Sequence, residues 1–165
     1  MGGIMISRGK TSALAPICAA ALAAFGSMLA AAPAYADEGG AVLDQINATR
    51  AANGCGPVAP NPQLTASAAR HANDMLRSGV AAHTGSDGSS LAQRVTDAGY
   101  TSYSDLGEIV FWANGPGGSP AAAVNWWMNS PGHRAVITDC ALTEAGFSAV
   151  RSGSMLTVTG DFGAK

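Results

Sequence analysis

The sequence predicts an α+β domain in which several helices pack on a small antiparallel sheet. Three observations support this fold class. Apolar residues recur at helical spacing through most of residues 41–98, an alternating pattern begins at Gly107, and two late apolar stretches flank the turn residues 152–154. Helices that mostly precede the strands, instead of alternating with them, indicate an α+β layer fold.

The first two helices are predicted at residues 41–53 and at about 63–78. Gly54 follows the first one, in the position where glycine commonly ends a helix. Each helix presents an apolar stripe at helical spacing. The stripe of the first helix is Val42, Leu43 and Ile46, and that of the second is Leu64, Ala68, His71, Ala72, Met75 and Leu76.

Two further helices are predicted from their first residues. Ser90 and Gln93 have the form of a capping box, which opens a short third helix that ends near residue 98. Ser119 followed by Pro120 is an N-cap with proline at the first helical position, and it opens a fourth helix over about 120–129. The apolar face of this fourth helix is Val124, Trp127 and Met128.

Three strands are predicted. Residues 107–114, "GEIVFWAN", alternate with the period of a strand. The stretches near 142–150 and 155–162 follow, and the turn residues at 152–154 join them into a hairpin.

Residues 1–36 predict a secretory signal peptide. The stretch starts with a short positive region, is then almost wholly apolar, and ends in Ala34-Tyr35-Ala36, with small residues at the positions that a signal peptidase reads. We expect cleavage after Ala36 and export of the remaining chain. The alternative is an uncleaved membrane anchor, because the uncharged part after Lys10 is long enough to cross a bilayer.

Residues 37–165 are predicted to form one domain, because 129 residues suffice for a single core. This part of the chain has seven Lys and Arg against eleven Asp and Glu, a formal net charge of −4. No basic cluster is present, so the composition excludes a nucleic-acid footprint. No long apolar run remains either, so we expect no transmembrane segment in the mature chain, and we expect a monomer.

Two cysteines, Cys55 and Cys140, lie in the predicted domain, and in an exported chain such a pair predicts a disulfide. Both are next to turn residues, where bridging is sterically easy. The bond would close a loop of more than eighty residues, for which the chain-entropy model gives about 4 kcal/mol of stability. The alternative is a pair of buried free thiols.

The chain contains three histidines, His71, His83 and His133. His71 lies on the apolar stripe of the second helix, which favours a packing role. His83 follows that helix in a glycine-containing turn. Pro131 cannot continue the fourth helix and Gly132 permits unusual backbone angles, so we expect His133 to sit on a tight turn.

Two carboxylates complete a candidate site. Glu108 opens the first strand, and Glu144 lies in an otherwise apolar strand, where a carboxylate needs a partner or water. Neutral imidazoles bind zinc and other transition metals, and a carboxylate can orient an imidazole or polarise a bound water. Two other interpretations stay open: a hydrogen-bonded structural cluster, or residues with no connection.

The sequence resembles the CAP superfamily, the group of cysteine-rich secretory proteins, antigen 5 and pathogenesis-related proteins, whose domain is also called the SCP domain. The similarity runs in order through nearly all of residues 37–165. Its most specific parts are "WMNSPGHR" and the "HTG" fifty residues upstream. The other matching segments are "QINATRAANGCGPVAPNPQLTASAARHANDM", "HTGSDGSSLAQRVTDAGY", "GEIV", "TEAGF" and "GDFG".

This resemblance implies a three-layer α-β-α sandwich with a small antiparallel sheet and a central cleft. Carried over by motif, the cleft would contain His83, Glu108, His133 and Glu144, with zinc or another divalent cation on the two histidines and the glutamates as catalytic candidates. The sequence departs from the family pattern at Ile109, where members often have asparagine after Gly-Glu.

Three functions are compatible with this resemblance, whose members include sterol and fatty-acid binders and a few claimed proteases. The first is a secreted binding module with a metal-capable cleft for a lipid, a sterol-like ligand or another cell-envelope component. The second is a metal-dependent hydrolase that uses Glu108 or Glu144 as its base. The third is a purely structural or antigenic domain. No serine or cysteine nucleophile is set beside a base, which disfavours acyl-enzyme chemistry.

Overall fold

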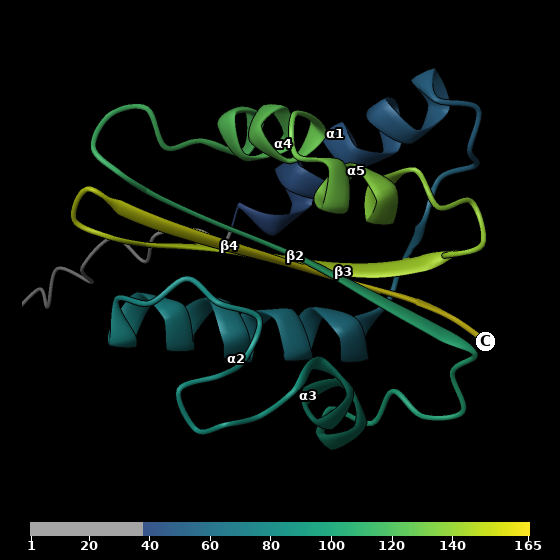
Figure 1. Ribbon diagram of the computed structural model, residues 1–165, viewed down its shortest axis with the longest axis horizontal. Helices are drawn as coiled ribbons and strands as arrows, with labels where there is room; N and C mark the ends of the chain where they lie inside the picture. The colour runs from purple at the N-terminus through teal and green to yellow at the C-terminus, as the bar shows by residue number, and fades with distance from the viewer. Residues whose placement is uncertain (1–37) are drawn as a thin grey trace, which may run out of the picture. The chain divides into compact units, whose positions relative to one another are not determined.

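Two layers of helices enclose a central sheet in the computed structural model, which describes residues 38–165 (Figure 1). The predicted signal peptide and its cleavage after Ala36 lie outside the described residues. The elements in order are α1 (Gly39–Ala52), β1 (Ala59–Pro60), α2 (Pro62–Ser78), α3 (Leu91–Asp97), β2 (Asp105–Asn114), α4 (Pro120–Met128), α5 (Pro131–Ile137), β3 (Glu144–Ser152) and β4 (Met155–Ala164). The predicted α+β class and the α-β-α sandwich are confirmed.

The sheet has the strand order β1-β3-β4-β2. The predicted hairpin is present, with β3 and β4 antiparallel from Glu144↔Gly163 to Ser152↔Met155. The other side of β4 pairs with β2, also antiparallel, which leaves β2 at one edge of the sheet. The parallel strand β1 was not predicted, because its two residues are too few to show a periodic pattern.

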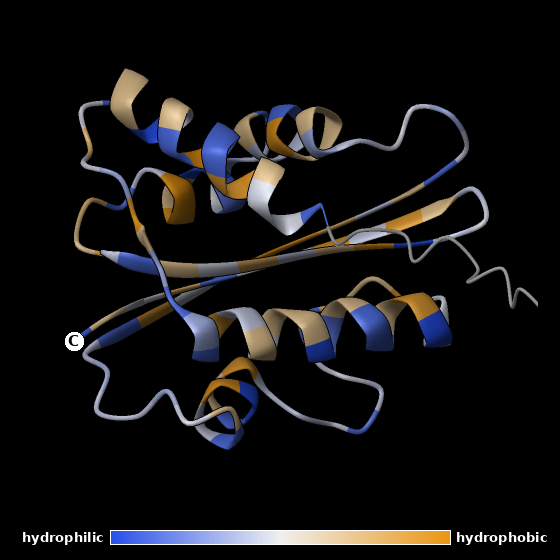
Figure 2. Cartoon of the chain, turned by 180° about the vertical axis from the view of Figure 1, so that it is seen from behind, coloured by the Kyte–Doolittle hydropathy of each residue, from blue (hydrophilic) through white to orange (hydrophobic). Residues whose placement is uncertain are grey.

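The two helical layers come from different parts of the chain. Figure 1 shows α2 and α3 on one face of the sheet and α1, α4 and α5 on the other. Helix α2 approaches β3 so closely that a Cβ atom at Gly146 would lie 2.0 Å from the backbone nitrogen of Thr65, so only glycine fits there. In Figure 2 hydrophilic residues recur along the side of α2 that faces away from the sheet. None of the helices in residues 38–165 is both long and apolar enough to cross a membrane.

The main core lies between the sheet and the layer of α1, α4 and α5. Trp127 is fully buried there, and its indole Nε1 donates a hydrogen bond of 2.8 Å to the carbonyl of Val110. Phe147 is also buried, as is Met75 of α2 on the opposite face of the sheet. Trp127 therefore joins α4 to the edge strand β2 by packing and by a hydrogen bond.

The two helix starts that were predicted from their caps are present, and a helix that was not predicted follows α4. The capping box of Ser90 and Gln93 and the Ser119-Pro120 start of α4 are both present. The expected tight turn at Pro131 and Gly132 is wrong, because Pro131 is the first residue of another helix, α5. Proline ends the preceding helix but suits the first position of a new one, where no backbone donor is required. His133 therefore lies in the first turn of α5.

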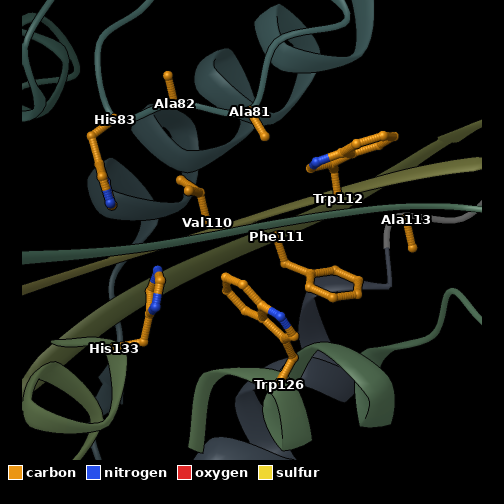
Figure 3. Close-up of a pocket in the computed structure, with 9 residues that line it drawn as sticks. All are labelled: Ala81, Ala82, His83, Val110, Phe111, Trp112, Ala113, Trp126 and His133. Carbon is orange, nitrogen blue, oxygen red and sulfur yellow. The ribbon is translucent and has the colours of Figure 1, made fainter. Parts of the chain in front are cut away.

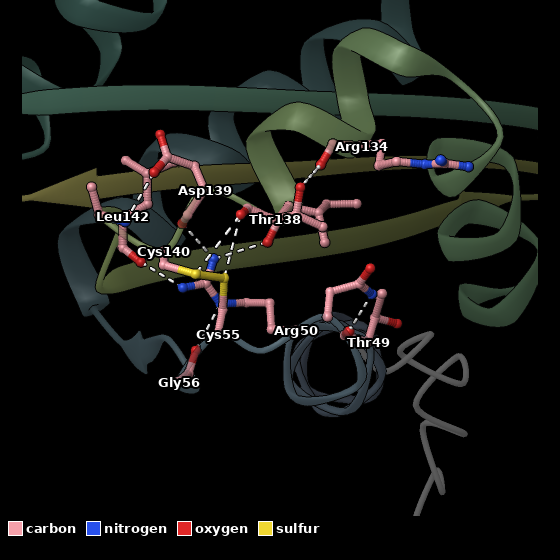
Figure 4. Close-up of a disulfide and its surroundings, with 12 residues drawn as sticks. Thr49, Arg50, Cys55, Gly56, Arg134, Thr138, Asp139, Cys140 and Leu142 are labelled. Carbon is pink, nitrogen blue, oxygen red and sulfur yellow. Dashed lines mark hydrogen bonds between the residues drawn. A yellow bond between two sulfur atoms is a disulfide. The ribbon is translucent and has the colours of Figure 1, made fainter.

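The predicted disulfide between Cys55 and Cys140 is present, with 5.0 Å between the two Cα atoms (Figure 4). The side chain of Arg50 lies beside it and is 1% exposed. Its guanidinium donates to carbonyls on both of the segments that the disulfide joins. The acceptors, at 2.8–2.9 Å, are Gly56, Ile137, Asp139 and Leu142. The guanidinium thus supplies donors to four carbonyls, two of them in fully buried bonds, near the C-terminal end of α5.

Replacing Arg50 by methionine should destabilise the protein strongly. The aliphatic part of the side chain is kept, but four carbonyl groups lose their donor, and each buried polar group left unpaired costs about 1–3 kcal/mol. We expect a loss of at least about 3 kcal/mol in the free energy of unfolding, measured by urea denaturation. Arg77→Met is the control, because that side chain is 72% exposed and exposed substitutions change stability by about 0.5 kcal/mol or less. A variant at position 50 that unfolds at the same urea concentration as the parent would refute this role.

Candidate functional site

Two imidazole rings meet at the free edge of β2. His83 lies in the loop that follows α2, and His133 lies in the first turn of α5, so the rings come from opposite helical layers. Their centroids are 6.1 Å apart and their planes are inclined by 30°. Figure 3 shows the two rings approaching each other from either side of the strand.

The orientation of His83 is set by Glu108. The Nδ1 atom of His83 lies 2.8 Å from Oε1 of Glu108, and because an ionised carboxylate only accepts, Nδ1 carries the proton. The remaining nitrogen, Nε2, is then the one with a lone pair for a ligand. The hydrogen bond to Glu108 raises the pKa of His83, although burial opposes this shift.

Glu108 is itself held by Arg94 of α3 in a buried ion pair, in which both side chains are at most 3% exposed. Arg94 also donates to the backbone carbonyls of Ser89, at 2.8 Å, and His83, at 3.2 Å. Burial alone would raise the pKa of Glu108, but the hydrogen bond from His83 and the charge of Arg94 outweigh it, and the pKa is lowered. Glu108 is therefore an ionised carboxylate with both oxygens occupied.

His133 has one nitrogen bound and one without a partner. Its Nδ1 lies 2.8 Å from the hydroxyl of Ser130, whereas its Nε2 is buried and has no hydrogen-bond partner within residues 38–165. Burial and the nearby His83 lower the pKa of His133, which keeps the ring neutral. A neutral imidazole with a buried, unpaired nitrogen is a site that a ligand atom or a metal ion would satisfy.

Glu144 is not part of this group. Its carboxylate accepts hydrogen bonds from the side chains of Asn61, at 2.9 Å, and Tyr100, at 2.8 Å. It lies on β3, which is separated from β2 by β4. Two cavities border His83, and Glu144 lines neither of them. Of the four residues in the expected cleft, the structure thus brings together His83, Glu108 and His133 but not Glu144.

The donor atoms at this position fit an ion held by two imidazoles. No group of three or more His, Cys, Asp or Glu side chains in residues 38–165 could hold a metal ion. An ion about 2.0–2.1 Å from a nitrogen of each ring would place the ring centres roughly 5–6 Å apart. The observed 6.1 Å between His83 and His133 is close to this range. The other coordination positions would have to come from water or from a ligand.

An apolar pocket of about 570 Å³ adjoins the histidine pair (Figure 3). Its size is typical of small-molecule sites. Trp126 and His133 both line it, with 5.0 Å between their ring centroids, and Trp126 is 49% exposed. The lining residues are Ala81, Ala82, His83, Val110, Phe111, Trp112, Ala113, Trp126 and His133. The site therefore combines two imidazole side chains with an apolar cavity.

Comparison with known proteins assigns this chain to a family. The sequence profile of the cysteine-rich secretory protein family, CAP, matches residues 43–162. The chain belongs to this family. No curated protein sequence matches it significantly. The similarity seen in the motifs is thereby confirmed over nearly the whole described region.

Three solved bacterial structures share the CAP fold. An extracellular SCP-domain protein from Bacillus anthracis has a TM-score of 0.66 at 22% identity, covering 78% of this chain and 40% of that one. An outer surface protein from Borrelia burgdorferi has a TM-score of 0.68 at 19% identity, covering 76% and 91%. A cysteine-rich secretory protein from Staphylococcus aureus has a TM-score of 0.60 at 18% identity, covering 81% and 40%. The chain thus spans 40% of the length of two of these proteins.

Two further polar residues of the CAP domain lie beneath the histidine pair. His71 is buried as expected from its place on the apolar stripe, and its Nε2 lies 2.7 Å from the carbonyl of Ala82 and 3.9 Å from Glu108. Asp161 was not predicted. It pairs with Glu108 in the register of β2 and β4, is fully buried, and has no hydrogen-bond partner for either oxygen within the described chain. Its only signal in the sequence is a charge inside an apolar strand.

Replacing Asp161 by asparagine should remove a pH-dependent destabilisation. Burial, and next the charge of Glu108, raise the pKa of Asp161 well above its usual range. The unfolded chain releases this proton near pH 4, whereas the folded protein keeps it. The parent therefore loses stability as the pH rises above about 4, by about 1.4 kcal/mol for each pH unit until the folded pKa is reached.

The measurement is urea denaturation of both proteins at pH 4 and pH 7. We expect Asp161→Asn to gain stability relative to the parent as the pH rises, because an amide does not titrate. A stability difference that is the same at both pH values would contradict the raised pKa.

Proposed function

We propose that this chain is an exported CAP-domain binding protein with a divalent metal ion, such as zinc, between His83 and His133. The adjoining pocket would take the apolar part of a cell-envelope ligand, with lipids among the candidates. The observation that carries this proposal is the buried, unpaired Nε2 of His133, which faces the second imidazole at the end of an apolar pocket.

Export is supported by several independent features. The signal-peptide pattern opens the chain, and a disulfide links Cys55 to Cys140, as is typical of proteins in oxidising compartments. Two of the structurally similar proteins are described as extracellular or as an outer surface protein. These features agree with a protein that acts outside the cytoplasm.

The residues around the histidine pair prepare it for binding. Glu108 fixes the tautomer of His83, and Ser130 occupies the second nitrogen of His133, so each ring can present one nitrogen to the same ion. A bound ion would supply positive charge for a polar group of the ligand, while the apolar pocket would exclude water from the rest. Two protein ligands imply modest affinity for the ion.

A hydrolase is less well supported than a binding module. A general base needs a free oxygen near the reacting atoms, but both oxygens of Glu108 are occupied, by His83 and by Arg94. Glu144 lies away from the histidines and is bound by Asn61 and Tyr100. The two catalytic candidates from the sequence are therefore both engaged in structural contacts.

Zinc titrated into the metal-free protein should bind with one-to-one stoichiometry at neutral pH, as measured by calorimetry. His83→Ala and His133→Ala should each weaken binding by at least about tenfold, since each removes one of two strong ligands. Glu144→Gln is the matched control and should bind like the parent, because Glu144 lies elsewhere. Binding that survives both histidine substitutions would place the metal site elsewhere in the protein.

Native mass spectrometry tests the pocket directly. Protein purified without chelators from its own secretion medium should carry added mass from a ligand, and Trp126→Ala should reduce the occupied fraction because it removes an aromatic wall of the pocket. Val80→Ala is the control, since Val80 is 60% exposed and does not line this pocket. A parent that binds neither metal nor ligand in these two experiments would favour a purely structural domain.

A further inference from the structure

The pocket beside the histidines lies against the edge of a strand. Four consecutive residues of β2, from Val110 to Ala113, line it. Because successive side chains of a strand point to opposite faces, a pocket that touches all four must border the edge of the strand. Strand β2 is the last strand on its side of the sheet. Figure 3 shows it crossing between Ala81 and Ala82 on one side and Trp126 on the other.

The backbone groups on this edge can be identified from two hydrogen bonds. The N–H of Gly115 donates to Ser154 across the β2–β4 pair, and the carbonyl of Val110 accepts from Trp127, away from β4. Backbone groups in an antiparallel pair alternate between the two sides of a strand. The odd-numbered residues of β2 therefore bond to β4, and the even-numbered residues, Trp112 among them, direct their N–H and C=O outward.

The backbone N–H and C=O of Trp112 favour a peptide over a lipid as the ligand. By this alternation its N–H and C=O point away from β4, and neither group takes part in a loop or side-chain hydrogen bond of residues 38–165; Trp112 as a whole is 51% exposed. A lipid tail in the pocket would cover these groups without pairing them, which costs free energy for every group left unpaired. An extended peptide would pair with both of them, as an added strand does at other exposed sheet edges.

The walls of the pocket also suit a peptide strand. The side chains of an added strand would point alternately towards the two helical layers. Apolar residues line the pocket on each side. Ala81 and Ala82 lie on the side of α2, and Phe111 and Trp126 lie on the side of α4.

We propose that the ligand of this pocket is an extended peptide segment with apolar side chains, which binds as a fifth strand along the free edge of β2. The segment would end beside or pass the His83–His133 pair. This inference rests on the proposed function in taking the pocket as a ligand site, and it names a peptide, in preference to a lipid, as the class of ligand.

Three capped peptides test the proposal, each with four central valine and leucine residues between lysines that keep it soluble. The first is unmodified, the second is N-methylated at every second residue, and the third is N-methylated at all central residues. Binding is measured by fluorescence anisotropy of a labelled copy. We expect the first two peptides to bind within about threefold of each other, because methylation at every second residue leaves the N–H groups on one edge of the peptide free to pair with β2. The third peptide has no free N–H group in its centre and should bind at least about tenfold more weakly than the first.

The protein side of the contact is tested at Trp112. Trp112→Ala removes only the side chain, whereas Trp112→Pro also removes the outward N–H and leaves the bonds to β4 intact, which an edge strand tolerates. We expect Trp112→Pro to weaken peptide binding about fivefold or more beyond Trp112→Ala, with melting temperatures of the two variants that agree. If Trp112→Pro fails to fold, the peptide series alone decides.

Two results would overturn the inference. One is a fully N-methylated peptide that binds as well as the unmodified peptide, since apolar contact alone would then suffice. The other is no peptide binding while palmitate binds and shifts the tryptophan fluorescence of the parent but not that of Trp126→Ala. That result would make the ligand a lipid and leave the proposed function intact. Failure of zinc, palmitate and peptide together would refute the proposed function as well.

Discussion

The buried ion pair between Arg94 and Glu108 organises the site from below. A buried charge must be paired, and here one guanidinium satisfies the carboxylate of β2 and two carbonyls of the loop between α2 and α3. The other carboxylate oxygen holds His83. Helix α3, the loop and the edge strand are thereby fixed relative to one another through a single polar cluster. The position of the accessible imidazole of His83 thus depends on a charge pair whose side chains are almost wholly buried.

The place of the site follows from the order of the strands. Since β2 is last in the sheet, both helical layers extend beside its free edge, and each contributes one histidine. A site on a face of the sheet could receive side chains from only one layer. The edge position explains why polar imidazoles, an apolar cavity and unpaired backbone groups occur together within a few residues of β2.

Features that depend on neighbouring residues or on cysteine count could be predicted from the sequence, whereas contacts that depend on strand order and register could not. The Ser90 and Ser119 caps, the final hairpin and the disulfide depend on neighbouring residues or on cysteine count, and the structure contains them. Pro131 was misinterpreted because the same residue can end one helix and start another. Glu144 and Asp161 depend on which strands are neighbours. Strand order places Asp161, and not Glu144, opposite Glu108, and no periodicity in the chain contains that information.

The two rings at the sheet edge are each fixed to a different helical layer. His83 is tied to the layer of α2 and α3 through Glu108 and Arg94, while α5, which carries His133, is held at its far end where Arg50 binds the carbonyl of Ile137. The distance between the two rings therefore depends on how the two helical layers are aligned across the sheet. A ligand or ion that bridges the rings would link the two helical layers directly at the edge of the sheet, and sliding of one layer along the other would break that link.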